Sequence, residues 1–196
     1  MDMAGVTLLT KEYPPYVYGG AGVHVDHLSK ELCKYMRVEV RCFGDQNIRE
    51  GNLKVYGYKV GGYGSKGIDQ VLEALAVNLA MSRTPPDGEV VHCHTWYTLM
   101  AGFWIKELYG VPLVVTVHSL EPLRPWKQRQ LGSAYRLSLW MEKTGVTCAD
   151  GIIAVSREMK RDVMGCYGVS GDKVEVIYNG IDTARFRPVT SAEALR

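Results

Sequence analysis

Residues 12–24 read EYPPYVYGGAGVH and join a short apolar run, residues 6–9 (VTLL), to the first amphipathic helix expected in the chain. The two prolines stiffen the first part of this loop, because proline fixes φ and has no N–H donor. Gly19, Gly20 and Gly22 permit positive φ and close approach of a ligand to the backbone. A helix that begins there directs free N–H groups and the positive end of its dipole at that ligand. The segment therefore predicts an anion-binding turn, with close packing of strand and helix as the alternative.

This turn differs from two familiar phosphate-binding motifs. The dinucleotide fingerprint Gly-x-Gly-x-x-Gly fails, because Val25 occupies the third glycine position when the pattern is aligned on Gly20 and Gly22. The next expected strand, residues 38–43, has its only carboxylate, Glu39, near its start. A P-loop is excluded because no Gly-Lys-Ser/Thr follows the glycines. The segment thus predicts neither an NAD site nor a P-loop, and we expect no cofactor.

Length and composition indicate an ordinary globular protein. The 196 residues fit one domain, and 46% hydrophobic with 22% charged residues is typical of a chain with a real core. A net charge of +2, with scattered basic residues, gives no reason to expect nucleic acid as a partner. Five widely spaced cysteines indicate reduced thiols in the cytoplasm. With no signal-peptide pattern and no run of about 20 apolar residues, we expect a soluble cytoplasmic protein without a membrane span.

Apolar runs and amphipathic segments alternate along the chain. About seven strands are expected, and the clearest are residues 6–9, 38–43, 90–94, 111–118 and 152–155. Between them the apolar residues recur with helical spacing; Leu72, Leu75, Ala76 and Leu79, for example, would form the core face of one helix. This alternation predicts an α/β fold with a doubly wound, mainly parallel, Rossmann-like sheet. Ligands of such a sheet bind beyond the carboxyl ends of its strands.

Three segments should meet at that edge: the glycine turn, residues 94–97 (HTWY) and residues 118–122 (HSLEP). His118 follows a strand of Val and Thr, so its ring should project into the crevice as a neutral donor or as a cation facing an anion. His92 and His94 allow a second interpretation, because a His-x-His pair opens some metal hydrolase sites. No second His pair and no His-Glu-x-x-His accompanies them. We therefore expect no metal and keep the metal hydrolase as an alternative.

Several motifs resemble those of GT-B glycosyltransferases, enzymes that use nucleotide sugars and consist of two Rossmann-like domains. These motifs are residues 12–15 (EYPP), 18–25 (YGGAGVHV), 94–97 (HTWY), 118–127 (HSLEPLRPWK), 153–156 (IAVS) and 179–182 (NGID). The resemblance covers nearly the whole chain and is closest to the bacterial glycogen synthase and maltose-1-phosphate synthase group. It implies that residues 1–178 form the amino-terminal Rossmann-like domain and residues 179–196 the start of an interdomain linker. The carboxyl-terminal nucleotide-binding domain would be absent, so the isolated domain should be inactive.

The resemblance also implies the reaction, which is retaining transfer of glucose from ADP-glucose to an α-1,4-glucan or to glucose 1-phosphate. His118 would be the catalytic residue, facing the transferred sugar and the leaving phosphate, and no protein nucleophile is required. The residues expected to bind substrate are Gly19, Gly20, Gly22, His94, Thr95, Glu121, Arg124 and Lys127. Arg124 and Lys127 should favour a phosphorylated acceptor, because their charges suit phosphate, and Trp126 would offer a flat face to a sugar ring.

Two departures from other bacterial glycogen synthases bear on these roles. The glycine turn has Tyr18 and Ala21 beside its glycines and lacks the lysine that those enzymes carry there. Thr95 stands where they have aspartate after His-x-His. Both departures favour the actinobacterial-type branch of the group. A non-catalytic sugar-binding module is a further alternative, which turnover of ADP-glucose by a full-length form would exclude.

Overall fold

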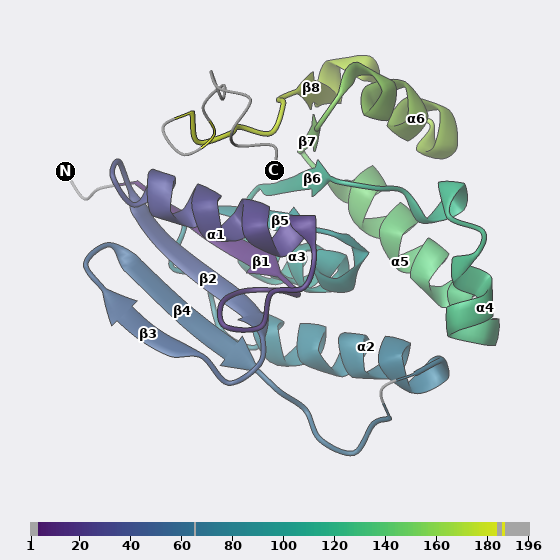
Figure 1. The fold of residues 1–196 in the computed structure, drawn as a ribbon, viewed down its shortest axis with the longest axis horizontal. Coiled ribbons are helices and arrows are strands. Elements are labelled where there is room, and N and C mark those ends of the chain that lie inside the picture. The colour runs from purple at the N-terminus through teal and green to yellow at the C-terminus, as the bar shows by residue number, and fades with distance from the viewer. Residues whose placement is uncertain (1–3, 65, 184–185, 187–196) are drawn as a thin grey trace, which may run out of the picture.

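The computed structural model describes residues 4–64, 66–183 and 186. Within them, eight strands form one sheet in the order β3-β4-β2-β1-β5-β6-β7-β8 (Figure 1). The strands are β1 Gly5–Thr10, β2 Arg37–Phe43, β3 Asn47–Glu50, β4 Leu53–Tyr58, β5 Val90–His94, β6 Leu113–Val117, β7 Gly151–Ala154 and β8 Val174–Val176. All neighbouring pairs are parallel except β3 with β4. The predicted doubly wound, mainly parallel α/β sheet is confirmed, and the strand beyond the expected seven is the exposed edge strand β3.

Helices cover both faces of this sheet (Figure 1). They are α1 Gly20–Leu32, α2 Ile68–Ser82, α3 Leu99–Tyr109, α4 Lys127–Leu131, α5 Tyr135–Cys148 and α6 Arg157–Tyr167. α1 packs through Val25 against Val6 and Leu8 of β1, within the smaller of two buried clusters. α2, α3 and α5 contribute to the larger cluster on the opposite face, which includes Leu9 of the same strand. Alternate residues of β1 thus serve two cores, and the whole strand is buried.

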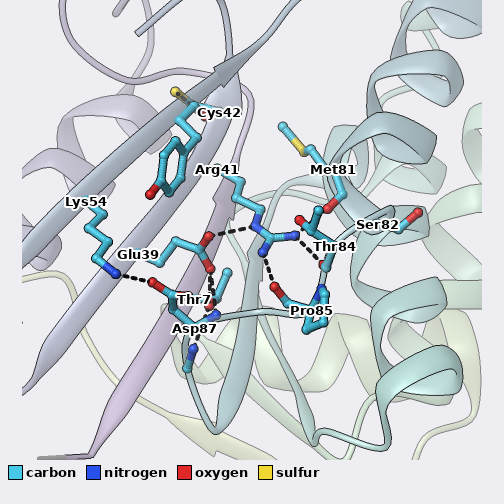
Figure 2. A network of polar contacts seen from close by, with 12 residues as sticks. Thr7, Glu39, Arg41, Cys42, Lys54, Met81, Ser82, Thr84, Pro85 and Asp87 are labelled. Atoms are coloured by element: carbon cyan, nitrogen blue, oxygen red, sulfur yellow. Dashed lines mark hydrogen bonds and ion pairs between the residues drawn. The ribbon is translucent and has the colours of Figure 1, made fainter. Parts of the chain in front are cut away.

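A buried ion pair fixes the amino ends of the central strands (Figure 2). Nε of Arg41 lies 3.0 Å from Oε1 of Glu39, and both side chains are nearly inaccessible. Oε2 of Glu39 accepts from the hydroxyl of Thr7 (2.7 Å) and from the backbone N–H of Asp87 (3.0 Å). Arg41 also donates to the backbone carbonyl oxygens of Met81, Thr84 and Pro85. The network ties β1 and β2 to the loop that leads from α2 into β5.

No helix among the described residues combines the length and the apolar character that crossing a membrane requires.

Of the expected linker, residues 179–196, the structure describes 179–183 and 186; the remainder lies outside the described residues. Residues 179–183 lie against α1 and line a cavity of about 870 Å³ together with its first turns.

Candidate active site

The backbone of the glycine turn differs from the expected one. α1 begins at Gly20, and Gly19 before it is extended, with φ −139°. Neither these two glycines nor Gly22 has positive φ, so the turn does not use the positive φ that glycine permits. Their small size matters instead, because a Cβ atom on Gly22 would lie 2.6 Å from Cβ of Glu12, while one on Gly20 would meet no atom within 4 Å. Gly22 lets α1 approach the loop, and Gly20 leaves space open at the start of the helix.

Glu12 holds this turn in place. Its Oε2 accepts hydrogen bonds from the backbone N–H groups of Tyr18 (3.0 Å) and Gly19 (2.7 Å). The first N–H groups of α1 itself have no partner within the helix and point along its axis, where they favour negative charge. No sequence signal singles out Glu12, because the acidic residue of a capping box lies inside the helix and Glu12 lies seven residues before Gly19.

A cavity of about 480 Å³ lies beside this turn at the carboxyl edge of the sheet. The predicted site residues that line it are Gly19, Gly20, Thr95, His118, Arg124 and Lys127. Gly22, His94 and Glu121 do not line it, but they lie against Glu12, His118 and Arg124, which do. Segments that follow β1, β5 and β6 therefore meet at one edge, as expected for a doubly wound sheet.

Positive charge dominates the wall of this cavity. Among the described residues, its cationic side chains are those of Lys11, Arg124 and Lys127, and its one carboxylate is that of Glu12. Glu12 already accepts two backbone N–H groups, so the cationic side chains face the cavity in excess. Nζ of Lys11 lies 3.8 Å from the ring centre of Tyr97, and burial lowers the pKa of Lys11 to about 8. Lys11 could not be predicted from the sequence, because a single lysine after a strand carries no signal of its own.

His118 follows β6 directly and is supported by His94, the last residue of β5. Nδ1 of His94, which is fully buried, lies 3.2 Å from Nε2 of His118. His92 lies behind them, with Nε2 2.7 Å from Oγ1 of Thr116. Burial lowers the pKa of His118 to about 4 and that of His92 to about 3. His118 is therefore a neutral hydrogen-bonding group at pH 7, which favours the first of the two roles considered for it.

His24 joins this group from α1, although the sequence analysis gave it no role. The centre of its ring lies 4.9 Å from that of His118 and 5.4 Å from that of His94. The side chain of His24 is hydrogen-bonded to Asn179, and burial lowers its pKa. Within the described part of the chain, the group that could hold a metal is His24, His94 and His118. The geometry gives no support to a metal hydrolase built on His92 and His94, because Nε2 of His92 is engaged with a threonine.

Thr95 combines strain with an unpaired polar atom. It is the one non-glycine residue with positive φ (67°) among those the structure describes. A backbone conformation of this kind costs about 1–3 kcal/mol and persists where the surroundings impose it, often at functional sites. Its Oγ1 is buried and has no hydrogen-bond partner within the described residues. Thr95 also lines the cavity, so this strained residue and its unpaired hydroxyl lie at the wall of the site.

Glu121 supports the loop after His118 instead of facing the cavity. Its side chain is buried, its backbone N–H donates to the carboxylate of Glu142 (3.0 Å), and its carbonyl accepts from the hydroxyl of Tyr135 (2.6 Å). Burial raises the pKa of Glu142 to about 7. Arg124 lies on the cavity side of this loop, 3.5 Å from Oε1 of Glu121. Trp126 is 55% exposed and does not line the cavity, so the structure does not place a flat face for sugar there.

Comparison with known proteins identifies the family. Residues 18–185 match the family described as Glycosyltransferase Family 4. The chain belongs to this family. It is 46% identical over 184 residues to alpha-maltose-1-phosphate synthase of Mycolicibacterium smegmatis, covering 93% of this chain and 46% of that protein. It is 27% identical to glycogen synthase of Mycobacterium tuberculosis, covering 92% of this chain and 49% of that protein.

Solved structures show the same fold. Sucrose-phosphate synthase from Thermosynechococcus elongatus superposes with a TM-score of 0.71 at 16% identity, covering 98% of this chain and 52% of that one. The catalytic domain of starch synthase IV from Arabidopsis thaliana, bound to ADP and acarbose, gives 0.58 at 17% identity, covering 98% and 54%. The chain spans about half the length of the curated relatives it matches. This Family 4 chain thus has the Rossmann-like architecture of one half of a GT-B glycosyltransferase.

Proposed function

We propose that the chain is the amino-terminal domain of a retaining glucosyltransferase that transfers glucose from ADP-glucose to glucose 1-phosphate. One observation carries the choice of acceptor: Lys11, Arg124 and Lys127 surround the cavity beside His118. Elongation of an α-1,4-glucan is the second candidate acceptor reaction, and the end of a glucan carries no charge for these cations to bind. The 46% identical relative is named alpha-maltose-1-phosphate synthase, which supports the same choice.

The residues of the site suit this reaction. The start of α1 at Gly20 would face the donor diphosphate, because helix amino termini bind phosphate oxygens and no side chain occupies that space. His118 would donate or accept a hydrogen bond at the transferred sugar, since it is neutral at pH 7. Its contact with His94 holds one ring nitrogen and leaves the other for a ligand. Fixed dipoles of this kind stabilise charge that develops in the transition state without a protein nucleophile.

The cationic side chains would bind the phosphate of the acceptor. Arg124 offers a planar fork that can pair two phosphate oxygens, while Lys11 and Lys127 add point charges from two other sides. Arg124 is itself oriented by the hydroxyl of Ser119 (3.3 Å) and by Glu121. The acceptor phosphate would therefore lie between the loop after β1 and the loop after β6.

The proposal includes a second domain and a cytoplasmic location. Residues 1–178 would be the amino-terminal domain, residues 179–196 the start of a linker, and a carboxyl-terminal half would bind most of the nucleotide. The span of about half of each relative supports this division. The chain alone should then bind donor weakly and show no turnover. Five free cysteines suit a reducing compartment.

The decisive experiment compares two acceptors in a protein that carries both halves. Arg124→Ala together with Lys127→Ala should raise KM for glucose 1-phosphate at least about tenfold, a modest loss of charge-assisted binding. Elongation of a glucan should be nearly unchanged. Arg129→Ala serves as the matched control, because this exposed arginine on α4 does not line the cavity. Equal losses with both acceptors would indicate damage to the loop or the donor site, and no loss with either would place the two residues in solvent.

A further inference from the structure

Three histidines from three separate elements converge behind the cavity. His24 comes from the second turn of α1, His94 ends β5, and His118 follows β6. One ring nitrogen of each lies within 4.8 Å of the nitrogens of the other two. The catalytic role proposed above uses only His118, so it does not explain why the other two imidazoles gather around it.

The distances suit coordination of one ion. An ion with nitrogen ligands at about 2.0–2.1 Å in a tetrahedral arrangement keeps those nitrogens about 3.3 Å apart. Nδ1 of His94 and Nε2 of His118 already lie 3.2 Å apart. His24 is only partly buried, and its ring centre lies 4.9 Å from that of His118. A side-chain rotation that moves its nitrogen by about 1–2 Å, at the expense of its hydrogen bond with Asn179, would complete a set of three ligands.

His94 supplies an independent observation. Its ring is fully buried, yet Nε2 has no hydrogen-bond partner among the described residues. A buried polar atom without a partner costs about 1–3 kcal/mol and requires an explanation. Ligation through Nδ1 would replace a weak contact between two imidazoles by coordinate bonds and would leave the proton of His94 on Nε2, whereas an ion on Nε2 would satisfy that atom but could not use the 3.2 Å spacing to His118.

The ligand chemistry and the access route define the ion. Three imidazoles without a carboxylate suit zinc and its first-row neighbours, whereas magnesium and calcium prefer oxygen ligands. His118 lines the 480 Å³ cavity, His24 lines the 870 Å³ cavity, and Gly20 and Asn179 line both. The cluster can therefore be reached from two sides, and a water molecule or a ligand could occupy the fourth position.

We propose that His24, His94 and His118 bind a divalent first-row transition-metal ion such as Zn²⁺. The ion would bind Nε2 of His118 and leave Nδ1, the nitrogen assigned to the sugar, but its positive charge beside the transferred sugar would oppose the positive charge that develops there. Zinc should therefore lower kcat of glucose transfer; this consequence alone rests on the proposed function.

Metal titration of the purified protein tests the site without any assay of turnover. Equilibrium dialysis should give one Zn²⁺ per chain, and Co²⁺ should produce the visible absorption of a tetrahedral site without a thiolate charge-transfer band. His24→Ala should weaken binding of both ions at least tenfold. The matched control is His27→Ala, because His27 lies on the same helix, is exposed and does not belong to the cluster. Circular dichroism of both variants shows whether the fold is kept, and His94 is left intact because its removal would open a space in the core.

Three results would overturn the site: no stoichiometric binding by the unaltered protein, equal binding by His24→Ala, or a thiolate band that assigns the ion to cysteine. If His24→Ala does not fold, His24→Gln replaces it, because glutamine retains the bulk but is a poor zinc ligand. Binding that depends on His24, without inhibition of glucose transfer, would confirm the metal site and contradict the role proposed for His118. Failure of the site and failure of the proposed function are therefore distinguishable.

Discussion

At the amino edge of the sheet, each guanidinium nitrogen of Arg41 and both carboxylate oxygens of Glu39 have a hydrogen bond (Figure 2). The carboxyl edge differs. The buried side-chain atoms without a hydrogen-bond partner in the described part of the chain belong to Gln46, His94, Thr95 and Glu121, which all lie at or after the carboxyl ends of β2, β5 and β6. A satisfied polar network stabilises the fold, whereas unsatisfied atoms cost stability and persist where a ligand can use them. The same sheet therefore has a structural edge and a functional edge.

The largest expected effect concerns the structural edge. Arg41→Met leaves the Glu39 carboxylate buried without its cation, and breaking a buried ion pair in this way costs about 3–5 kcal/mol of unfolding free energy. Chemical denaturation measures this loss, while kcat of the folded variant should be unchanged. Lys54→Ala is the control, because its ion pair with Asp87 at the same edge is about half exposed and should contribute less than about 1 kcal/mol. A loss of activity without a loss of stability in Arg41→Met would contradict the division between the edges.

His118→Ala tests the functional edge. In a protein with both halves, kcat should fall at least about a hundredfold, the scale for removing one positioned donor in a transition state. The unfolding free energy should change little, because His118 is partly exposed at the cavity. Steady-state release of ADP provides the measurement. Retention of the unaltered kcat would show that His118 has no catalytic role.

Two neighbouring glycines allow a sharper comparison within the functional edge. Gly20→Val should raise the donor KM about tenfold with little loss of stability, because its Cβ meets no atom but its methyl groups would fill the space expected to hold a phosphate. Gly22→Ala should lower the stability and leave the donor KM nearly unchanged, since its Cβ would lie 2.6 Å from Cβ of Glu12. Donor titrations and thermal unfolding of both variants give the comparison. If Gly20→Val loses stability but keeps its donor KM, the glycines serve packing only.

The sequence predicted the features that depend on order along the chain. Alternating apolar runs and helical segments predicted the parallel sheet, and the ends of β1, β5 and β6 predicted which segments meet. The buried faces of the helices were harder to predict from the sequence, because α2 is apolar on most sides. Val71 and Met81 are buried, whereas Leu79, expected in the core, is 59% exposed. Periodicity cannot choose between two apolar faces; only the neighbouring helices decide.

The functional site shows the same limit. His118 and Arg124 follow one strand and could be associated from the sequence, and both line the cavity. Lys11 and His24 reach the site from other segments, and a single lysine or histidine gives no signal before the chain is folded. In the sequence, Glu39 was informative only as evidence against an NAD site, because it is the one carboxylate of its strand and lies near the start instead of at the end. Its pairing with Arg41 could not be distinguished from an exposed charge pair, because burial depends on the loop before β5.

The smallest expected effect is a pH dependence that separates Lys11 from the other cations. Burial lowers the pKa of Lys11 to about 8, so the side chain is mostly charged at pH 7 and mostly neutral at pH 9. If its charge binds the acceptor phosphate, kcat/KM for glucose 1-phosphate should fall by roughly threefold to tenfold as pH rises from 7 to 9, with a midpoint near the pKa of the free enzyme. The rate with a glucan acceptor should not show this decrease between pH 7 and pH 9.

Two variants test whether deprotonation of Lys11 causes this decrease in kcat/KM. Lys11→Arg keeps a charge that does not titrate below pH 12, so kcat/KM should stay level to pH 9. Lys11→Met should be low and level, because the charge is absent throughout. At saturating acceptor, kcat should decrease less between pH 7 and pH 9 than kcat/KM does, since a bound phosphate stabilises the protonated amine and raises its pKa. If kcat/KM of Lys11→Arg decreases with pH as in the unaltered protein, another group causes the decrease. The cavity would then bind its acceptor through the loop after His118 alone.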